Sequence, residues 1–350
     1  MKQNSNSPLA LLFTISAFAL TLAMPAPCLS GGGAREIYNH GLFLSMSGDY
    51  EGAIESYMEA LNIEPNYFDA LVSLGIAFGN IGKHEESVDA FRQALNAVPD
   101  DPEALRLLGG ACFRAGQYKE GADSFRKAVE VKPDYALAYY DLGESYLGIR
   151  MYRDAAEAYA SALAIDPGFG EANFGLGVAY DGLGMFEEEV VAYQSALRAK
   201  PDYALAWHNL GVVYIELGKY GDSVEAYNRC VGLRPGYAKA HFGLGIAYDA
   251  LEKYPESVAS FSEAARLDPE MAEAHFNMAE VMAKTGDYEG AREAYSRGLS
   301  IKSDYPDAHY MLATVCLKLG DTDCALAEYK VLSEMDIAKA VKLYDLIYGD

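Results

Sequence analysis

Prolines recur in this chain at a fixed step of 34 residues, and this period constrains the fold more than any other feature. The series runs through Pro65, Pro99, Pro133, Pro167, Pro201, Pro235 and Pro269. A fixed period of this length is typical of a repeat array, in which every unit packs against its neighbours. A chain of 350 residues exceeds what one globular core usually holds, so the period favours a solenoid over separate domains.

The repeat can be laid end to end as nine blocks. The blocks are 34–67, 68–101, 102–135, 136–169, 170–203, 204–237, 238–271, 272–305 and 306–339. Within a block, apolar residues at three- and four-residue spacings form two runs, which predicts two helices. A glycine that suits a left-handed helix cap separates the runs, and the proline stops the second helix. These separating glycines are Gly48, Gly82, Gly116, Gly184, Gly218, Gly286 and Gly320.

A second set of small residues predicts close contact between the two helices of a block. Gly211 in the first run, for example, is expected to face Ser223 in the second. In block five the small position opposite Gly177 is taken by Glu189. We expect this carboxylate to point to solvent, because no cation lies at helical spacing from it.

Block six shows most clearly which known repeat this pattern resembles. It reads ALAWHNLGVVYIELGKYGDSVEAYNRCVGLRPGY, and the informative residues are Trp207, Leu210, Gly211, Tyr214, Tyr227 and Pro235. They resemble the tetratricopeptide repeat over about residues 34–339. The resemblance weakens where Ser303 and Ile337 replace the final proline and His40 replaces the first leucine. It implies an all-α, right-handed solenoid of antiparallel helix pairs.

Two further patterns complete this organisation. Blocks four and six share PDYALA, while blocks five and seven share FGLGVAYDGL and FGLGIAYDAL, so the middle resembles a duplicated pair of 68 residues. After block nine, DIAKAVKLYDLIYGD can form an amphipathic helix whose C-terminal part is residues 340–350. We expect that helix to cap the last hydrophobic face.

The first 30 residues resemble a secretory signal, followed by a short glycine linker at 31–33. Lys2 precedes the apolar run 9–24, and small residues follow it, so we expect cleavage near Cys28 to Ser30 and export to the periplasm or cell surface. Sixteen residues are short for a membrane span, yet an uncleaved anchor stays open. Lipidation at Cys28 is disfavoured by the prolines before it.

Charge and motif content exclude several classes of function. A net charge of −23 makes nucleic acid and anionic lipid poor partners. No phosphate loop, nucleophile elbow or zinc motif occurs, so we expect no enzyme and no cofactor. The column His241, His275 and His309 is expected to pack, because histidines one repeat apart are too far apart to share a metal. We expect Cys112, Cys230 and Cys316 to be packing residues, and a disulfide between Cys316 and Cys324 is the less favoured interpretation.

The family resemblance places peptide binding in a concave groove lined by the first helix of each repeat. One row of groove positions is mainly aromatic, and either packing or peptide binding would account for the aromatic residues. The row consists of Tyr38, Val72, Arg106, Tyr140, Phe174, His208, Phe242, Phe276 and Tyr310. Blocks four to seven add carboxylates opposed by Lys239 alone, namely Asp141, Glu144, Glu171, Asp181, Glu216 and Asp249. The family's asparagine ladder is interrupted, with Asn39, Asn209 and Asn277 at its position.

These features predict a non-enzymatic adaptor that docks a basic or apolar peptide segment in its groove. Two alternatives stay open. One is a cell-envelope assembly scaffold, as in pilus or outer-membrane assembly, and the other is an auxiliary subunit of an envelope enzyme. The expected partners are proteins or peptides, and the oligomeric state is left open.

Overall fold

The computed structural model describes residues 33–349, and the predicted leader lies outside this range. All regular secondary structure in the described range is helical, in 19 helices. The chain divides into two compact units, with Met185 the last residue of unit 1 and Phe186 the first of unit 2. The predicted all-α fold of consecutive helix pairs is therefore confirmed.

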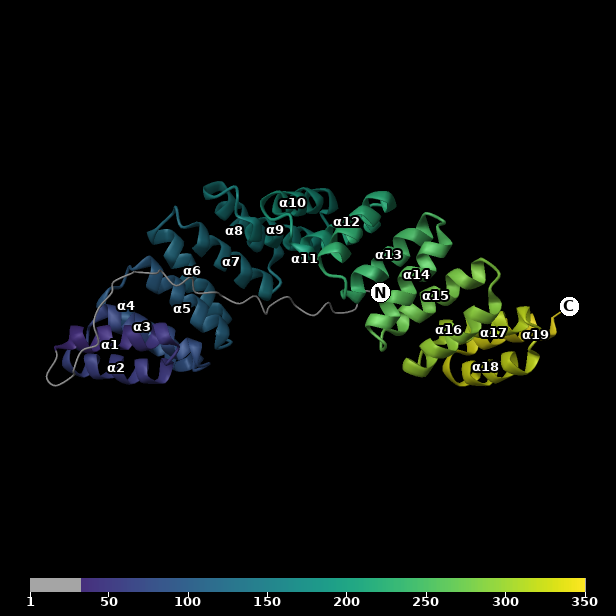
Figure 1. Cartoon of the computed structure of the whole chain (residues 1–350), viewed down its shortest axis with the longest axis horizontal. Coiled ribbons are helices and arrows are strands. Elements are labelled where there is room, and N and C mark those ends of the chain that lie inside the picture. Colours follow the sequence, from purple (N-terminus) through teal and green to yellow (C-terminus); the bar gives the residue numbers. More distant parts are fainter. Residues whose placement is uncertain (1–32, 350) are drawn as a thin grey trace. The chain divides into compact units, whose positions relative to one another are not determined.

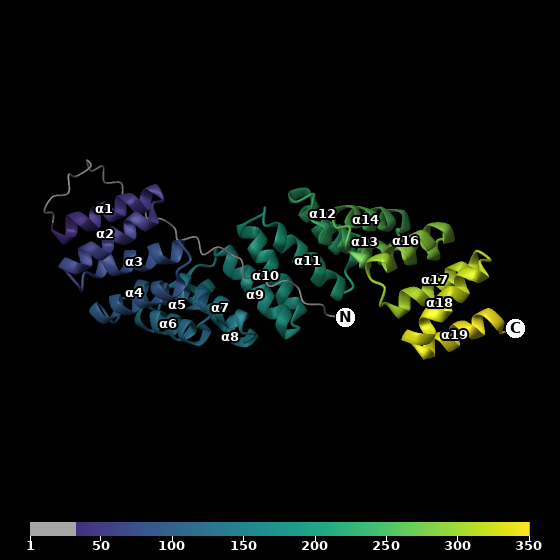
Figure 2. The same cartoon turned by 90° about the horizontal axis from the view of Figure 1, so that it is seen from below.

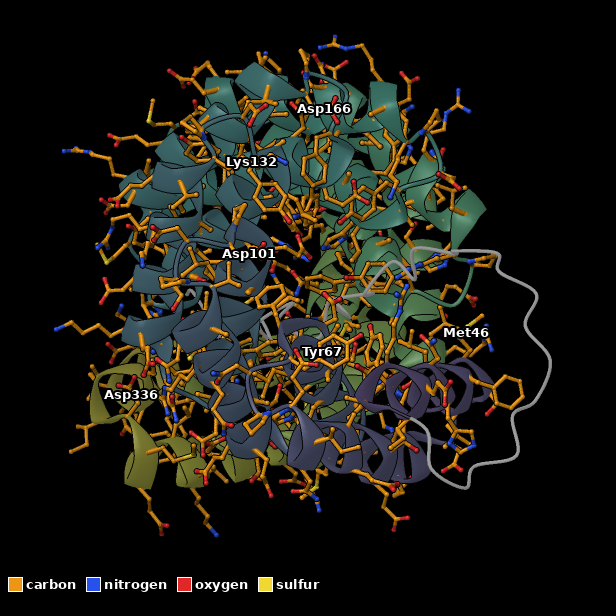
Figure 3. All side chains as sticks on the ribbon, turned by 90° about the vertical axis from the view of Figure 1, so that its left-hand side faces the viewer. Met46, Tyr67, Asp101, Lys132, Asp166 and Asp336 are labelled. Carbon is orange, nitrogen blue, oxygen red and sulfur yellow. A yellow bond between two sulfur atoms is a disulfide. The ribbon has the colours of Figure 1, made fainter. Side chains whose placement is uncertain are left out.

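Unit 1 contains four helix pairs and one further first helix. Its helices are α1 (Ala34–Ser47), α2 (Tyr50–Ile63), α3 (Phe68–Asn80), α4 (His84–Ala97), α5 (Pro102–Arg114), α6 (Tyr118–Val131), α7 (Ala136–Gly148), α8 (Tyr152–Ile165) and α9 (Gly170–Leu183). Each helix packs against the next one along the chain (Figure 1). Figure 3 labels turn residues of this stack that follow one another from repeat to repeat: Tyr67, Asp101, Lys132 and Asp166.

Unit 2 begins with a second helix and continues the same alternation. Its helices are α10 (Phe186–Ala199), α11 (Ala204–Glu216), α12 (Tyr220–Leu233), α13 (Ala238–Ala250), α14 (Tyr254–Leu267), α15 (Ala272–Lys284), α16 (Tyr288–Ile301), α17 (Pro306–Lys318), α18 (Thr322–Met335) and α19 (Ile337–Tyr348). Figure 2 shows α16 to α19 following one another toward the C-terminus. Consecutive helices are again in contact.

The predicted glycine caps are confirmed at all seven positions, where φ lies between 68° and 87°. L-residues with a side chain rarely adopt this left-handed conformation, so glycine is the residue that suits the turn. Two repeats lack the glycine, and there Arg150 and Glu252 adopt φ values of 61° and 59°. The turn geometry is thus kept even where the sequence does not favour it.

Glycines within the first helices make room for an aromatic ring from the second helix. A Cβ atom added at Gly109 would lie 2.7 Å from Cε1 of Phe125, and one at Gly245 would lie 2.5 Å from Cδ1 of Phe261. Both rings are fully buried. The expected contact between small residues is confirmed too, since Ser223 Oγ donates a 2.8 Å hydrogen bond to the Gly211 carbonyl. Close packing between paired helices therefore depends on these glycines.

Two expectations were wrong. Glu189 is only 3% exposed. It lies on the face of α10 that also buries Ala192, Tyr193 and Ala196, so helical periodicity turns it inward. The structure also joins Cys316 and Cys324 by a disulfide, with their Cα atoms 5.9 Å apart. The turn between α17 and α18 brings these two positions together, although they are eight residues apart in the sequence.

The last helix covers the end of the stack as expected. Ala340 and Leu343 of α19 are buried in the core that also contains Leu332. The opposite side of α19 exposes Ile337, Val341 and other apolar residues. Between residues 33 and 349, none of the helices combines the length and the apolar character that crossing a bilayer requires.

Candidate functional site: the first-helix surfaces

The first helices of successive repeats contact one another and line one surface in each unit. In unit 1, α1, α3, α5, α7 and α9 form such a series, and in unit 2 α11, α13 and α15 do. Successive second helices in the described range make no contact of this extent. We call these the first-helix surfaces of unit 1 and unit 2.

The resemblance to tetratricopeptide repeats assigns four positions of each first helix to this surface, at the second, fifth, ninth and twelfth residues of a block. On α11 they are Leu205, His208, Val212 and Ile215, and on α13 they are Lys239, Phe242, Ile246 and Asp249. All eight are partly or largely exposed, and Val212 is 40% exposed. Unit 2 therefore presents a stripe of accessible apolar side chains across two adjacent helices.

The aromatic side chains at the fifth position are first of all packing residues. The Tyr140 ring lies 5.9 Å from the Tyr159 ring and 4.9 Å from the Phe169 ring. His208 repeats this arrangement with Tyr227 and Tyr237, at 5.6 and 5.0 Å. Each of these rings thus contacts the second helix of its own repeat and the turn that precedes the next repeat.

In unit 1 a network of ionic groups occupies the first-helix surface. Arg106 on α5 bonds to Asp141 on α7 at 2.9 Å, to Glu103 at 2.8 Å and to the Tyr135 hydroxyl at 2.8 Å. The Arg106 side chain is 14% exposed and that of Asp141 only 2%. Burial raises the pKa of Asp141 to about 7, although Arg106 opposes the shift. The Asp141 carboxylate therefore interacts with Arg106 of the same protein.

A second carboxylate in unit 1 is also satisfied internally. Glu144 on α7 accepts a hydrogen bond from the hydroxyl of Tyr159 on α8. Burial raises the pKa of Glu144, and the bond from Tyr159 partly offsets the shift. Because Tyr159 is fully buried and Glu144 is half-buried, their mutual hydrogen bond offsets part of the desolvation cost.

The equivalent positions of unit 2 are mostly neutral. Asn209 donates a 3.1 Å hydrogen bond to the hydroxyl of Tyr193. Burial lowers the pKa of His208 to about 4, and Lys239 adds to the effect, so the ring is neutral at physiological pH. Nδ1 of His208 is buried without a hydrogen-bond partner in the described residues.

The predicted site residues fall into different environments and into both units. Tyr140, Asp141, Glu144, Glu171, Phe174 and Asp181 belong to unit 1, and His208, Asn209, Glu216, Phe242, Asp249, Phe276 and Tyr310 to unit 2. Asp181 and Glu216 are exposed, whereas Asp141, Phe174 and Phe276 are buried. Asp249 pairs with Lys284 at 2.8 Å. The accessible carboxylates are therefore fewer than the sequence suggested.

Sequence reasoning missed the partners that neutralise these carboxylates. Arg106 was placed in the groove row without its link to Asp141, and Lys284 was not considered. Both pairs join residues 35 positions apart, one repeat plus one residue. Searching for opposite charges at this separation finds both.

Two histidines of the predicted column, His241 and His309, make structural hydrogen bonds. Nε2 of His241 lies 2.9 Å from the Pro235 carbonyl, and Nε1 of Trp207 donates to the Pro201 carbonyl at the same distance. His309 repeats the contact with Ser303. Across residues 33–349, no group of three or more His, Cys, Asp or Glu side chains could hold a metal ion.

Stacked helix pairs with an accessible, chemically mixed surface along their first helices define a helical-repeat interaction protein. The model of the tetratricopeptide repeat matches residues 72–136, 140–204, 191–238, 208–270 and 242–306. A TPR repeat model matches 46–82, and a further tetratricopeptide repeat model matches 283–336. These matches cover well over half of the sequence, so the chain belongs to the tetratricopeptide repeat family, whose repeats are in general non-catalytic interaction scaffolds.

Several solved structures are similar to part of this chain. A crystal structure of MamA is 30% identical, covering 46% of this chain and 94% of its own, with a TM-score of 0.45. YrrB, described as a TPR protein with an unusual peptide-binding site, is 24% identical over 53% of this chain and 96% of its own, with a TM-score of 0.50. PilF of Pseudomonas aeruginosa is 19% identical, covering 64% of this chain and 98% of its own, with a TM-score of 0.51. No curated protein sequence matches this chain.

Proposed function

We propose that this protein is a non-enzymatic adaptor that docks a peptide segment of a partner protein on its first-helix surfaces. The observation that carries the proposal is the apolar stripe of unit 2, where Val212 and Ile246 stay accessible on the adjacent helices α11 and α13. No described layer of the protein covers this stripe. An apolar segment would bury it and gain roughly 25 cal/mol per Å² of apolar surface removed from water.

Charge favours a segment that also carries Lys or Arg. Asp181 on α9 and Glu216 on α11 are exposed carboxylates on first helices, and the whole chain carries a net charge of −23. Such a field speeds the encounter with a basic partner more than it adds to final affinity. We therefore propose that the apolar stripe provides most of the binding affinity, and that the exposed carboxylates steer the basic partner toward it.

We further propose that the protein acts outside the cytoplasm. The apolar leader with a small-residue cleavage region supports export. The disulfide between Cys316 and Cys324 supports it as well, because such bonds persist mainly in oxidising compartments.

One observation favours the assembly-scaffold alternative. The outer side of α19 exposes Ile337 by 73%, Val341 by 56% and Tyr348 by 57%. Exposed apolar patches of this kind often mark interaction sites. A scaffold would use this face and a groove for different partners.

Selection from random 12-residue peptides displayed on phage tests the docking function. Enriched peptides are synthesised and their Kd values measured by fluorescence anisotropy. We expect Val212→Ser with Ile246→Ser to weaken binding at least tenfold. Val191→Ser, which changes a 60% exposed valine on the second helix α10, is the matched control and should leave Kd unchanged.

A second double variant tests the steering role of the exposed carboxylates in the same assay. Asp181→Lys with Glu216→Lys should slow association of basic peptides and flatten its dependence on salt. Failure to enrich any peptide, or equal binding by the serine variants and the wild type, argues against docking on these surfaces.

A further inference from the structure

The last helix, α19, has an apolar outer face that no described part of the protein covers. Ile337, Val341, Tyr344, Leu346 and Tyr348 are all exposed there. No other described helix exposes more than two large apolar side chains. The terminal cap of a solenoid normally presents a polar outer face, because that face meets water. The outer face of α19 is therefore suited to a further protein layer rather than to water.

The exposed residues have the spacing of a seam between two paired helices. Ile337, Val341, Tyr344 and Tyr348 are separated by four, three and four residues, as the a and d positions of a coiled coil are. They lie along one side of α19, turned away from Leu343, which is buried in the core. A seam of this kind fits another helix that lies along it.

Three tyrosines extend this face from α19 onto α18. The rings of Tyr329 and Tyr344 lie 6.0 Å apart, and those of Tyr344 and Tyr348 lie 4.8 Å apart. Tyrosine is enriched at protein interfaces, because its ring supplies a large contact area while its hydroxyl stays compatible with water. A shallow hollow lies beside the rings and is lined by Tyr329, Ser333, Ile337, Ala340, Val341 and Tyr344.

The charge of this face suits a second copy of the same chain. Residues 336–348 contain two lysines and two aspartates and are neutral, whereas the whole chain carries a net charge of −23. Asp336 and Lys339 pair with each other at 2.8 Å, and Lys342 and Asp345 are exposed on the same side of the helix. In an antiparallel pair of α19 helices the order of these charges is reversed in the other copy. Lysine of each copy then runs alongside aspartate of the other, a match that a purely basic or purely acidic partner does not offer.

We propose that α19 is a self-association surface, through which two copies of the chain pair about a two-fold axis with their α19 helices antiparallel. The apolar seams pack against each other, and Tyr329 and Ser333 of α18 widen the contact. Two helices of 12 residues, each about 18 Å long, bury less than the roughly 1,200 Å² of a standard interface, so the dimer is weak and depends on concentration. The pairing does not depend on peptide docking, and it brings two copies of the first-helix surfaces into one assembly.

Sedimentation velocity of the purified protein, from micromolar to submillimolar concentrations, tests the pairing. We expect a monomer–dimer equilibrium that becomes stronger at high salt, because screening weakens the repulsion between two chains of charge −23. Val341→Glu places a carboxylate in the seam of both copies and should raise the dimer Kd at least tenfold. Val191→Glu, which changes a similarly exposed valine on α10, is the matched control and should leave the dimer Kd unchanged.

A second variant tests the orientation of the pair. Lys342→Gln removes an attraction from an antiparallel pair and should raise the dimer Kd about two- to fivefold. In a parallel pair the same lysines would lie side by side, and their removal would lower the dimer Kd. Lys119→Gln removes an exposed lysine of α6 and controls for the change in net charge.

Two results would overturn self-association through α19: a protein that stays monomeric over the whole concentration range, or equal dimerisation by Val341→Glu and the wild type. A dimer that Lys342→Gln makes stronger would overturn the antiparallel arrangement. Circular dichroism of each variant checks that the fold is kept, as expected for substitutions at exposed positions.

Discussion

The duplicated parts of the chain, α7 to α9 in unit 1 and α11 to α13 in unit 2, have the same framework and different surfaces. Gly143, Tyr159 and Gly175 recur 68 residues later as Gly211, Tyr227 and Gly243. A Cβ atom added at any of these four glycines would lie within 3.0 Å of the tyrosine ring. The residues between them differ. Tyr140, Asp141 and Glu144 become His208, Asn209 and Val212.

The difference shows how one framework serves two purposes. In unit 1 the surface polar groups bind each other, through Arg106 with Asp141 and Tyr159 with Glu144. In unit 2 the same positions hold Asn209 and Val212, and Val212 stays accessible. Polar groups that bind each other stabilise the repeat, whereas an accessible apolar side chain can be covered by a ligand.

The largest expected effect on stability comes from breaking the ionic network of unit 1. Arg106→Ala leaves Asp141 buried without its cation, and we expect the free energy of unfolding to fall by about 3 kcal/mol or more. Asn209→Ala, at the position of unit 2 equivalent to Asp141, removes a neutral hydrogen bond and should cost about 1 kcal/mol. Urea unfolding followed by circular dichroism measures both.

The pH dependence of this variant sharpens the test. The pKa of Asp141 is raised to about 7 in the folded protein, from an ordinary value of 3.8. A raised pKa means that stability from this group is present at low pH and lost as pH rises toward 7. The penalty of Arg106→Ala should therefore be larger at pH 8 than at pH 5; a penalty independent of pH would contradict the buried charge.

An intermediate effect on stability should distinguish the two buried tyrosines, Tyr159 in unit 1 and Tyr227 in unit 2. Tyr159→Phe deprives the buried Glu144 of its donor and should lower the free energy of unfolding by about 1–3 kcal/mol. Tyr227→Phe removes a hydroxyl that forms no hydrogen bond within the described residues and should change it by less than about 0.5 kcal/mol. Thermal and urea unfolding of both variants give the comparison, and equal losses would mean that the two hydroxyls are equally satisfied.

The smallest effect should be the same in both units, because it concerns the shared framework. Arg150→Gly in unit 1 and Glu252→Gly in unit 2 relieve a left-handed backbone conformation and should each raise the free energy of unfolding by about 0.5–1 kcal/mol. Arg153→Gly, within the α8 helix, is a control that should destabilise. A gain in one unit only would show that the two turns are not equivalent.

Much of the framework could be predicted because it follows from local rules. The period predicted the helix pairs, and the glycine at each turn predicted the left-handed caps that the structure shows. The surface could be predicted only in part. Asp141 was expected to attract a ligand, yet Arg106 from the preceding repeat binds it. Glu189 was expected in solvent, yet helical periodicity buries it.

The sequence by itself determined the repeat, the helix pairs, their turns and the family, because each of these depends on residues close together along the chain. Tertiary structure alone decided which polar groups of the first helices are satisfied. Arg106 and Asp141, like Lys284 and Asp249, are about one repeat apart and meet only when repeats stack. The close contact between Gly243 and the Tyr227 ring likewise depends on packing, since it joins two neighbouring repeats.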